Sequence, residues 1–356
     1  MATLRLRDRD AIMTKEGLIF RVFGYAHPSN AYVCDAEYAP AEIFKSKNPK
    51  AFRIAGKHVF CKFYEDEGWK FIKNNFPQHM IYLPTLRRKV VGVKHSNIVE
   101  VRKPNETLGE LVEKKPRDEL SKALQSALKI VTERSGLSTN NFGVFGSLLH
   151  GFYHPQFSDI DLIVYGRKNL AKLRETLQEL YQARKFLFRN EFERNDLIKG
   201  KNWRFQNYSS KEFVWHQQRK LIYAVFNDEK SGRTIKTEFE PVKDWKEIQD
   251  THFSEMKIVQ KGWAKMFAYI TEDYDAPFIP SVYGIQPLEI LDEKAGAGEV
   301  GRLVSYMEEF RMQAQKGEKV YIEGNLEEVV TPKDRFYQIT LTYCPRYYGQ
   351  VLKVVS

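Results

Sequence analysis

The chain has 356 residues, of which 42% are hydrophobic and 13% aromatic, enough apolar material to fill the cores of two or three domains. No uninterrupted apolar stretch approaches the length of a membrane span, and the first residues lack the apolar core of a signal peptide, so we expect a cytoplasmic protein. The formal net charge of +10 favours an anionic partner such as a nucleic acid or a nucleotide. Cys34, Cys61 and Cys344 are odd in number and widely separated, which fits neither a disulfide framework nor a thiolate metal site.

Residues 1–104 are predicted to form a separate N-terminal α+β domain. A helix is expected at residues 67–75, and strands are expected in four β-rich runs, at residues 18–25, 31–36, 58–64 and 90–101. Asp8, Arg9 and Asp10 alternate in charge, which predicts a solvated surface turn. No residue pattern in this segment indicates reaction chemistry, so we expect the domain to select substrate.

A polar connector is expected between Pro104 and Pro116, before an amphipathic helix over residues 118–135. The apolar positions of this helix recur at helical spacing, Asp118 or Arg117 begins it, and Gly136 ends it. We expect the helix to pack beside the central sheet as scaffold.

The next segment joins a short apolar run, residues 142–145, to a Gly-Ser turn. The run is typical of a buried strand, and Gly146 permits a tight turn with close approach of another backbone. A helix is predicted to begin at Gly146 and Ser147, so its free N–H groups and the Ser147 hydroxyl would face the end of the strand. This arrangement predicts a phosphate-binding site. His150 and His154 follow, and we expect both to be packing or surface residues.

Two carboxylates follow on a β-rich run that begins near Ser158. Strand side chains alternate between faces, so Asp159 and Asp161 are predicted to point the same way while Ile160 and Leu162 point to the other side. Two like charges this close repel each other, and a divalent cation between them relieves the repulsion. Hard oxygen ligands suit Mg²⁺ or Mn²⁺, and the chemistry indicated is in-line phosphoryl or nucleotidyl transfer.

The apolar strand, the Gly146-Ser147 turn and the Asp159-Ile160-Asp161 run resemble the polymerase β-like nucleotidyltransferase superfamily, and the whole chain resembles archaeal predicted nucleotidyltransferases. Members of the superfamily move a nucleoside monophosphate from an NTP to a hydroxyl. The resemblance implies a central nucleotidyltransferase domain over residues 105–252, with a mixed sheet and helices. It also implies a two-metal-ion site, with Gly146 and Ser147 contacting the NTP phosphates.

After the two carboxylates, Asn169 is predicted to cap a crossover helix that runs through Tyr181. Positive charge is then interleaved with aromatic residues between 184 and 205, a pattern that can contact a triphosphate or stack a base but is also typical of a solvated helix with a buried aromatic stripe. The candidate polyphosphate contacts are Lys199, Lys201 and Arg204.

Two further strands are predicted at residues 221–226 and 233–242, joined by a polar turn that contains Gly232. The resemblance implies a third metal-binding carboxylate on the second of these strands. Glu238 is the first choice and Glu240, on the same strand face, is the alternative. Related enzymes usually carry Asp here, so the longer Glu is a departure from the pattern.

Residues 253–356 are predicted to form a β-rich C-terminal domain that resembles an OB-like barrel, with a helical or looped insert at 301–315. Strands are expected at residues 263–271, 278–284, 319–330 and 335–342. Such barrels often bind oligonucleotides, and five residues offer stacking and charge, namely Tyr337, Tyr343, Arg346, Tyr347 and Tyr348. A structural or dimerising role for this domain is an equal alternative.

The sequence therefore predicts a cytoplasmic, metal-dependent enzyme that moves an NMP from an NTP to an acceptor hydroxyl. Asp159, Asp161 and Glu238 are the predicted catalytic and metal-binding residues. The predicted acceptor is a nucleic acid, RNA rather than DNA, and in particular an RNA 3′ end. The alternatives are a transferase that nucleotidylates a protein and a non-catalytic nucleic-acid or nucleotide-binding protein built on a degenerate transferase domain.

Overall fold

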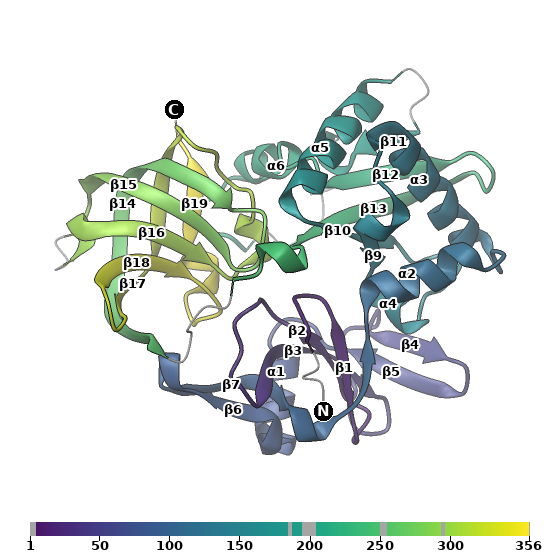
Figure 1. Ribbon diagram of the computed structural model, residues 1–356, viewed down its shortest axis with the longest axis horizontal. Coiled ribbons are helices and arrows are strands. Elements are labelled where there is room, and N and C mark those ends of the chain that lie inside the picture. The colour runs from purple at the N-terminus through teal and green to yellow at the C-terminus, as the bar shows by residue number, and fades with distance from the viewer. Residues whose placement is uncertain (1–4, 184–186, 194–203, 250–254, 293–295, 356) are drawn as a thin grey trace. The chain divides into compact units, whose positions relative to one another are not determined.

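The computed structural model describes residues 5–183, 187–193, 204–249, 255–292 and 296–355 (Figure 1). The chain divides into two compact units. The first comprises Met1–Leu83, Arg87–Arg189 and Ala224–Thr251, and the second comprises Pro84–Leu86, Asn190–Tyr223 and His252–Ser356. The described elements form an α+β protein with three sheets, and each sheet lies within one of the three segments predicted above. No helix in the described ranges is long and apolar enough to cross a membrane.

The N-terminal sheet of the first unit is antiparallel, and its main path runs β4-β5-β3-β2-β1-β8, with β7 paired to β3 and β6 paired to β7. Its strands are β1 Ala11–Thr14, β2 Ile19–Val22, β3 Ala31–Pro40, β4 Phe52–Ala55, β5 His58–Lys62, β6 Met80–Leu83, β7 Arg88–Lys94 and β8 Ile98–Arg102. Helix α1, Glu67–Asn75, begins and ends as predicted, because its one buried stripe covers the core formed by β2, β3 and β7. The run predicted at 90–101 is two strands, separated by the short 3₁₀ turn His95–Asn97.

The prediction of a solvated turn at Asp8, Arg9 and Asp10 is wrong. All three side chains are buried, with 1–3% of their surface exposed. The Arg9 guanidinium pairs with Glu240, Asp8 accepts a hydrogen bond from Gly24 N–H, and Asp10 accepts one from Arg7 N–H. Charge alternation in sequence does not distinguish a solvated turn from buried charged residues whose partners come from other residues of the fold.

Helices pack on the central sheet of the same unit, and α3 and α5 lie side by side (Figure 1). Helix α3, Glu119–Ser135, has the predicted limits, because Asp118 and Ser121 form a capping box and Gly136 ends the helix in the left-handed conformation. The connector predicted after Pro104 instead contains helix α2, Pro104–Glu113, with the proline at its first position. Helix α5, Arg167–Gln182, begins two residues before the predicted Asn169 cap, whose side chain donates to the Tyr165 carbonyl.

The central sheet is mixed, as the resemblance implied, with strand order β11-β12-β13-β10-β9. Strands β10 and β13 are parallel, whereas β9 and β10 are antiparallel. The strands are β9 Phe142–Val144, β10 Ile160–Tyr165, β11 Phe188–Asn190, β12 Tyr223–Asp228 and β13 Arg233–Val242.

The second unit contains helix α6, Ser210–Gln218, and a C-terminal sheet of six strands. These are β14 Lys257–Asp275, β15 Ser281–Ile290, β16 Val300–Ser305, β17 Lys319–Val330, β18 Arg335–Leu341 and β19 Val351–Val354. The helical or looped insert predicted at 301–315 is partly wrong, since residues 301–305 belong to β16, whereas the 3₁₀ turn Glu308–Phe310 lies in the remainder. The pairings run from β14 through β15, β16, β18 and β17 back to β14, and only the β16–β18 pair is parallel.

Candidate active site

Strand pairing brings the predicted carboxylates to one place in the first unit. In the parallel register of β10 and β13, Asp161 lies opposite Glu238 and Ile163 lies opposite Glu240. Asp159 precedes Asp161 by two residues, so the alternation of an extended chain directs it to the same side. The structure therefore places Asp159, Asp161 and Glu238 on one sheet face.

Glu238 and Asp159 raise the cost of ionising Asp161. Burial, followed by the negative charges of Glu238 and Asp159, raises the pKa of Asp161 to about 8. Burial also raises the pKa of Asp159, while the positive charges of Lys236, Arg233 and Lys62 lower it. This concentration of carboxylate charge is a feature of sites that bind a cation or transfer protons.

Gly146 permits this packing. It follows β9, begins the five-residue helix α4 (Gly146–His150), and has a φ of +60°. A Cβ atom added to Gly146 would lie 2.6 Å from Oδ2 of Asp161, a distance that no side chain tolerates. The preceding residue, Phe145, donates its N–H to the Asp161 carbonyl at 3.0 Å. Another group does approach Gly146 closely, as predicted, but this group is the Asp161 carboxylate rather than a backbone.

Glu238 is half-buried and pairs with a lysine of its own strand. The Lys236 Nζ lies 2.6 Å from Glu238 Oε1. The Lys236 charge also lowers the pKa of Asp159 and of Asp161. A cation of the protein thus offsets the carboxylate charge in this structure.

Glu240 has a different environment from Glu238. Its side chain is buried and lies 2.7 Å from the Arg9 guanidinium, which is itself 2% exposed. The Arg9 guanidinium also lies over the Phe145 ring, 5.3 Å from its centroid. This buried ion pair joins the segment before β1 to β13, and it commits Glu240 to a structural contact.

The carboxylates fit a divalent cation by donor type and by register. Hard carboxylate oxygens are the ligands that Mg²⁺ and Mn²⁺ prefer, and the mutual repulsion recorded in the pKa of Asp161 is the charge pattern that a cation relieves. Among the residues that the structure describes, no three His, Cys, Asp or Glu side chains are gathered closely enough to ligate one ion.

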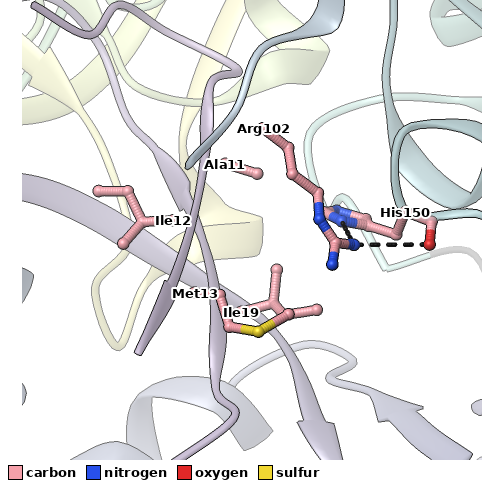
Figure 2. Close-up of a pocket in the computed structure, with 6 residues that line it drawn as sticks. All are labelled: Ala11, Ile12, Met13, Ile19, Arg102 and His150. Atoms are coloured by element: carbon pink, nitrogen blue, oxygen red, sulfur yellow. Dashed lines mark hydrogen bonds between the residues drawn. The ribbon is translucent and has the colours of Figure 1, made fainter. Parts of the chain in front are cut away.

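His150, at the end of α4, is a buried packing residue, as predicted. Its Nδ1 lies 3.1 Å from the Arg102 guanidinium (Figure 2), which can only donate, so the ring proton is on Nε2, 3.5 Å from Glu37. The hollow drawn in Figure 2, between these residues and β1 and β2, has no room for a water molecule. His154, by contrast, is exposed.

Of the three predicted polyphosphate contacts, the structure describes only Arg204. Lys199 and Lys201 lie outside the described ranges. Arg204 belongs to the second unit, where its guanidinium donates to the Tyr348 hydroxyl at 3.1 Å.

Most of the predicted stacking residues of the second unit already contact other side chains of that unit. Arg346 lies 3.7 Å from the centroid of the Trp263 ring, and Tyr347 donates to Glu309. Tyr343 is 61% exposed and stacks on Tyr347, with ring centroids 5.1 Å apart. Tyr343 is therefore the candidate most open to a ligand.

Sequence reasoning missed the cations near the acids: Lys236, Arg233 and Lys62, whose charges act on Asp159, and Arg9, which pairs with Glu240. The burial of Arg9 had a weak signal, since it lies in a short charged segment directly before the apolar strand β1. No signal in the sequence indicated the role of Lys62, because its approach to Asp159 and Asp161 depends on contacts between segments about a hundred residues apart in the chain.

Comparison with known proteins supports the nucleotidyltransferase resemblance. Residues 124–242, which contain Gly146, Asp159, Asp161 and Glu238, match the family model of the nucleotidyltransferase domain. An uncharacterised protein of the archaeon Methanocaldococcus jannaschii is 26% identical over 357 residues, which cover 99% of this chain and 99% of the relative. No solved structure matches the chain.

Proposed function

We propose that this protein is a metal-dependent nucleotidyltransferase of the two-metal-ion type, which moves an NMP from an NTP to a hydroxyl acceptor. The observation that carries the proposal is the β10–β13 register, which sets Glu238 opposite Asp161 inside the segment that matches the nucleotidyltransferase domain. Two acids close in sequence and a third on a neighbouring strand form the donor set that this chemistry requires.

In the proposed reaction, the acceptor hydroxyl forms a bond to the α-phosphorus of the NTP, and the bond from that phosphorus to the bridging oxygen breaks. Pyrophosphate leaves, and the hydroxyl proton passes to a carboxylate of the site or to water. Asp159, Asp161 and Glu238 would hold Mg²⁺ or Mn²⁺. When bound, these ions supply positive charge to the transferring phosphoryl group and to the leaving oxygen.

Residues around the acids have proposed roles in binding the donor. Gly146 leaves space beside Asp161, and Ser147 is half-buried in the first turn of α4. We assign both to contacts with the NTP phosphates. Lys199, Lys201 and Arg204 stay predicted polyphosphate contacts.

The proposed acceptor is RNA, through its 3′ end. The net charge of +10 supports a polyanionic partner. The pairing order of β14 to β18, which returns to its first strand, supports an OB-like barrel, a fold that often binds single strands. The exposed Tyr343 offers a ring on which a base can stack.

A non-catalytic nucleotide-binding protein is the second candidate, and one observation favours it. The Glu238 carboxylate pairs with Lys236 at 2.6 Å, and Glu238 stands where related enzymes usually have Asp. In that case the site would bind a nucleotide without transferring it.

The test is transfer of radiolabel from each α-labelled NTP, with Mg²⁺ or Mn²⁺, to total RNA and to total protein. The parent is compared with the double variant Asp159→Asn/Asp161→Asn. Label in RNA that the double variant does not transfer supports the proposal, and label in protein identifies a protein acceptor. Intact NTP binding without transfer to either fraction favours the second candidate.

A further inference from the structure

One face of the N-terminal sheet packs against the segment that follows α4. Tyr38 on β3 and Lys62 on β5 are register partners, so their side chains share a face, and Phe60 lies on that same face two residues before Lys62. The Phe60 ring stacks on Phe152, with centroids 4.7 Å apart, and the Tyr38 ring meets Phe152 edge-on at 5.3 Å. These contacts lie within the first unit, and they anchor the face that carries Lys62 beside the chain that leads from Gly146 to Asp159.

An irregularity in β3 gives this face an additional charged residue. Ile19 on β2 pairs with Tyr38 on β3, and the next residue, Phe20, pairs with Ala36. Glu37 therefore has no register partner on β2 and forms a β-bulge. Such bulges redirect side chains and are frequent next to active sites. Here Glu37 reaches His150 at 3.5 Å, and Arg102 contacts the other ring nitrogen of that histidine. The arrangement fixes β3 and β5 against the end of α4.

Lys62 lies on this anchored face, opposite Tyr38 in the strand register. It is half-buried, and among the residues that the structure describes it forms no direct ion pair. Its positive charge lowers the pKa of Asp159, of Asp161 and of Glu37. Lys236, the other lysine that acts on both aspartates, is already paired with Glu238 at 2.6 Å. Lys62 is thus a cation held beside the carboxylates and available for a further anion.

We propose that Lys62 binds a phosphate group of the NTP donor, so that the N-terminal sheet forms part of the active site. This inference rests on the proposed function and adds a residue to it. An NTP brings several negative charges to a site that already contains three carboxylates, and an ammonium group with three donors suits phosphate oxygens. The ring contacts of Tyr38 and Phe60 with Phe152 hold the strands that carry these residues and Lys62 in place.

The competing explanation is that Lys62 only offsets the charge of Glu37. Binding of ATP and of AMP in the presence of Mg²⁺ is therefore measured by titration calorimetry for the parent, Lys62→Ala, Lys62→Arg and Glu37→Gln/Lys62→Ala. Lys57→Ala, a change at an exposed lysine in the turn of the same β4–β5 hairpin, is the matched control. Thermal unfolding of each variant shows whether the fold is retained.

We expect Lys62→Ala to weaken ATP binding by about 10- to 100-fold, the range of one charge-assisted hydrogen bond, and AMP binding much less. Lys62→Arg should restore most of the affinity, Lys57→Ala should leave it unchanged, and the Glu37→Gln background should not rescue the alanine variant. Equal affinity of Lys62→Ala and the parent for ATP, rescue by Glu37→Gln, or a parent that binds no ATP would overturn the proposal. A parent that binds ATP through Lys62 but transfers no label would instead overturn the proposed enzymatic activity and leave the phosphate contact standing.

Discussion

Asp161 on β10 and Glu238 on β13 are direct partners in a parallel strand pair, although 77 residues separate them in the chain. Glu240, two residues further along, is instead buried in an ion pair with Arg9. Glu238 is therefore the acid available for chemistry beside Asp161, whereas Glu240 stabilises the fold.

Replacement of Asp161 by Asn should abolish most transfer without unfolding the protein. Removing one preorganised charge at the reacting centre costs about 100-fold or more in rate. The amide has the shape of the carboxyl, and since burial already raises the pKa of Asp161, loss of the charge should not lower the melting temperature. Label transfer and thermal unfolding measure the two effects. Undiminished transfer would exclude Asp161 from the site.

Glu238→Gln and Glu240→Gln should differ in what they lose. The first should reduce transfer by about 100-fold with little change in stability, because Glu238 is half-buried and its ion pair is with Lys236 on its own strand. The second should retain transfer at temperatures where it is folded but melt earlier, because it weakens a buried ion pair. The reverse pattern of activities would make Glu240 the third acid.

The pair between Arg9 and Glu240 should contribute strongly to stability. Arg9→Met removes the guanidinium that lies 2.7 Å from the buried Glu240 carboxylate, so it should lower the free energy of unfolding by about 3–5 kcal/mol. The double variant Arg9→Met/Glu240→Leu should lose less than the sum of the two single changes. Urea unfolding gives the free energy of unfolding of the parent, the two single variants and the double variant. Additive losses would show that the two residues do not interact.

Gly146→Ala should impair the site, and Gly136→Ala provides the matched control. Both glycines have positive φ, +60° and +68°, so each alanine costs about 1–2 kcal/mol of backbone strain. At Gly136 the added methyl group meets nothing within 4 Å, whereas at Gly146 it meets Asp161 Oδ2 at 2.6 Å. We expect Gly136→Ala to transfer label normally. Gly146→Ala should lose transfer, and it should be less stable than Gly136→Ala. Equal behaviour of the two variants would contradict the close packing of Gly146 on Asp161.

Stability should fall as the pH rises through the titration of Asp10. Burial raises the pKa of this carboxyl from 3.8 to about 7 in the folded protein. The folded state therefore binds more protons than the unfolded state between about pH 4 and pH 7, and the stabilisation present at pH 4 is lost across that range. Asp10→Asn should give a flatter stability profile and a higher melting temperature at pH 8. Parallel profiles for the parent and the variant from pH 4 to pH 8 would exclude Asp10 as the titrating group.

Local signals in the sequence determined much of the secondary structure and the motif. Helices α1 and α3 were predicted at their limits because apolar periodicity, caps and a terminal glycine are properties of neighbouring residues. The Gly146, Asp159 and Asp161 motif was found for the same reason. The placement of Asn169 as a cap failed because Tyr165 offers its side chain a different partner.

Only the tertiary structure decided which acid faces Asp161 and what surrounds the pair. A shift of two residues in the β10–β13 register would set Glu240 opposite Asp161 and keep the same sheet face, so strand alternation cannot choose between Glu238 and Glu240. Likewise, the burial of Arg9 and the approach of Lys62 arise from packing between segments far apart in the chain. Such contacts depend on the shape and charge of both surfaces together, and the pattern of either segment alone does not contain them.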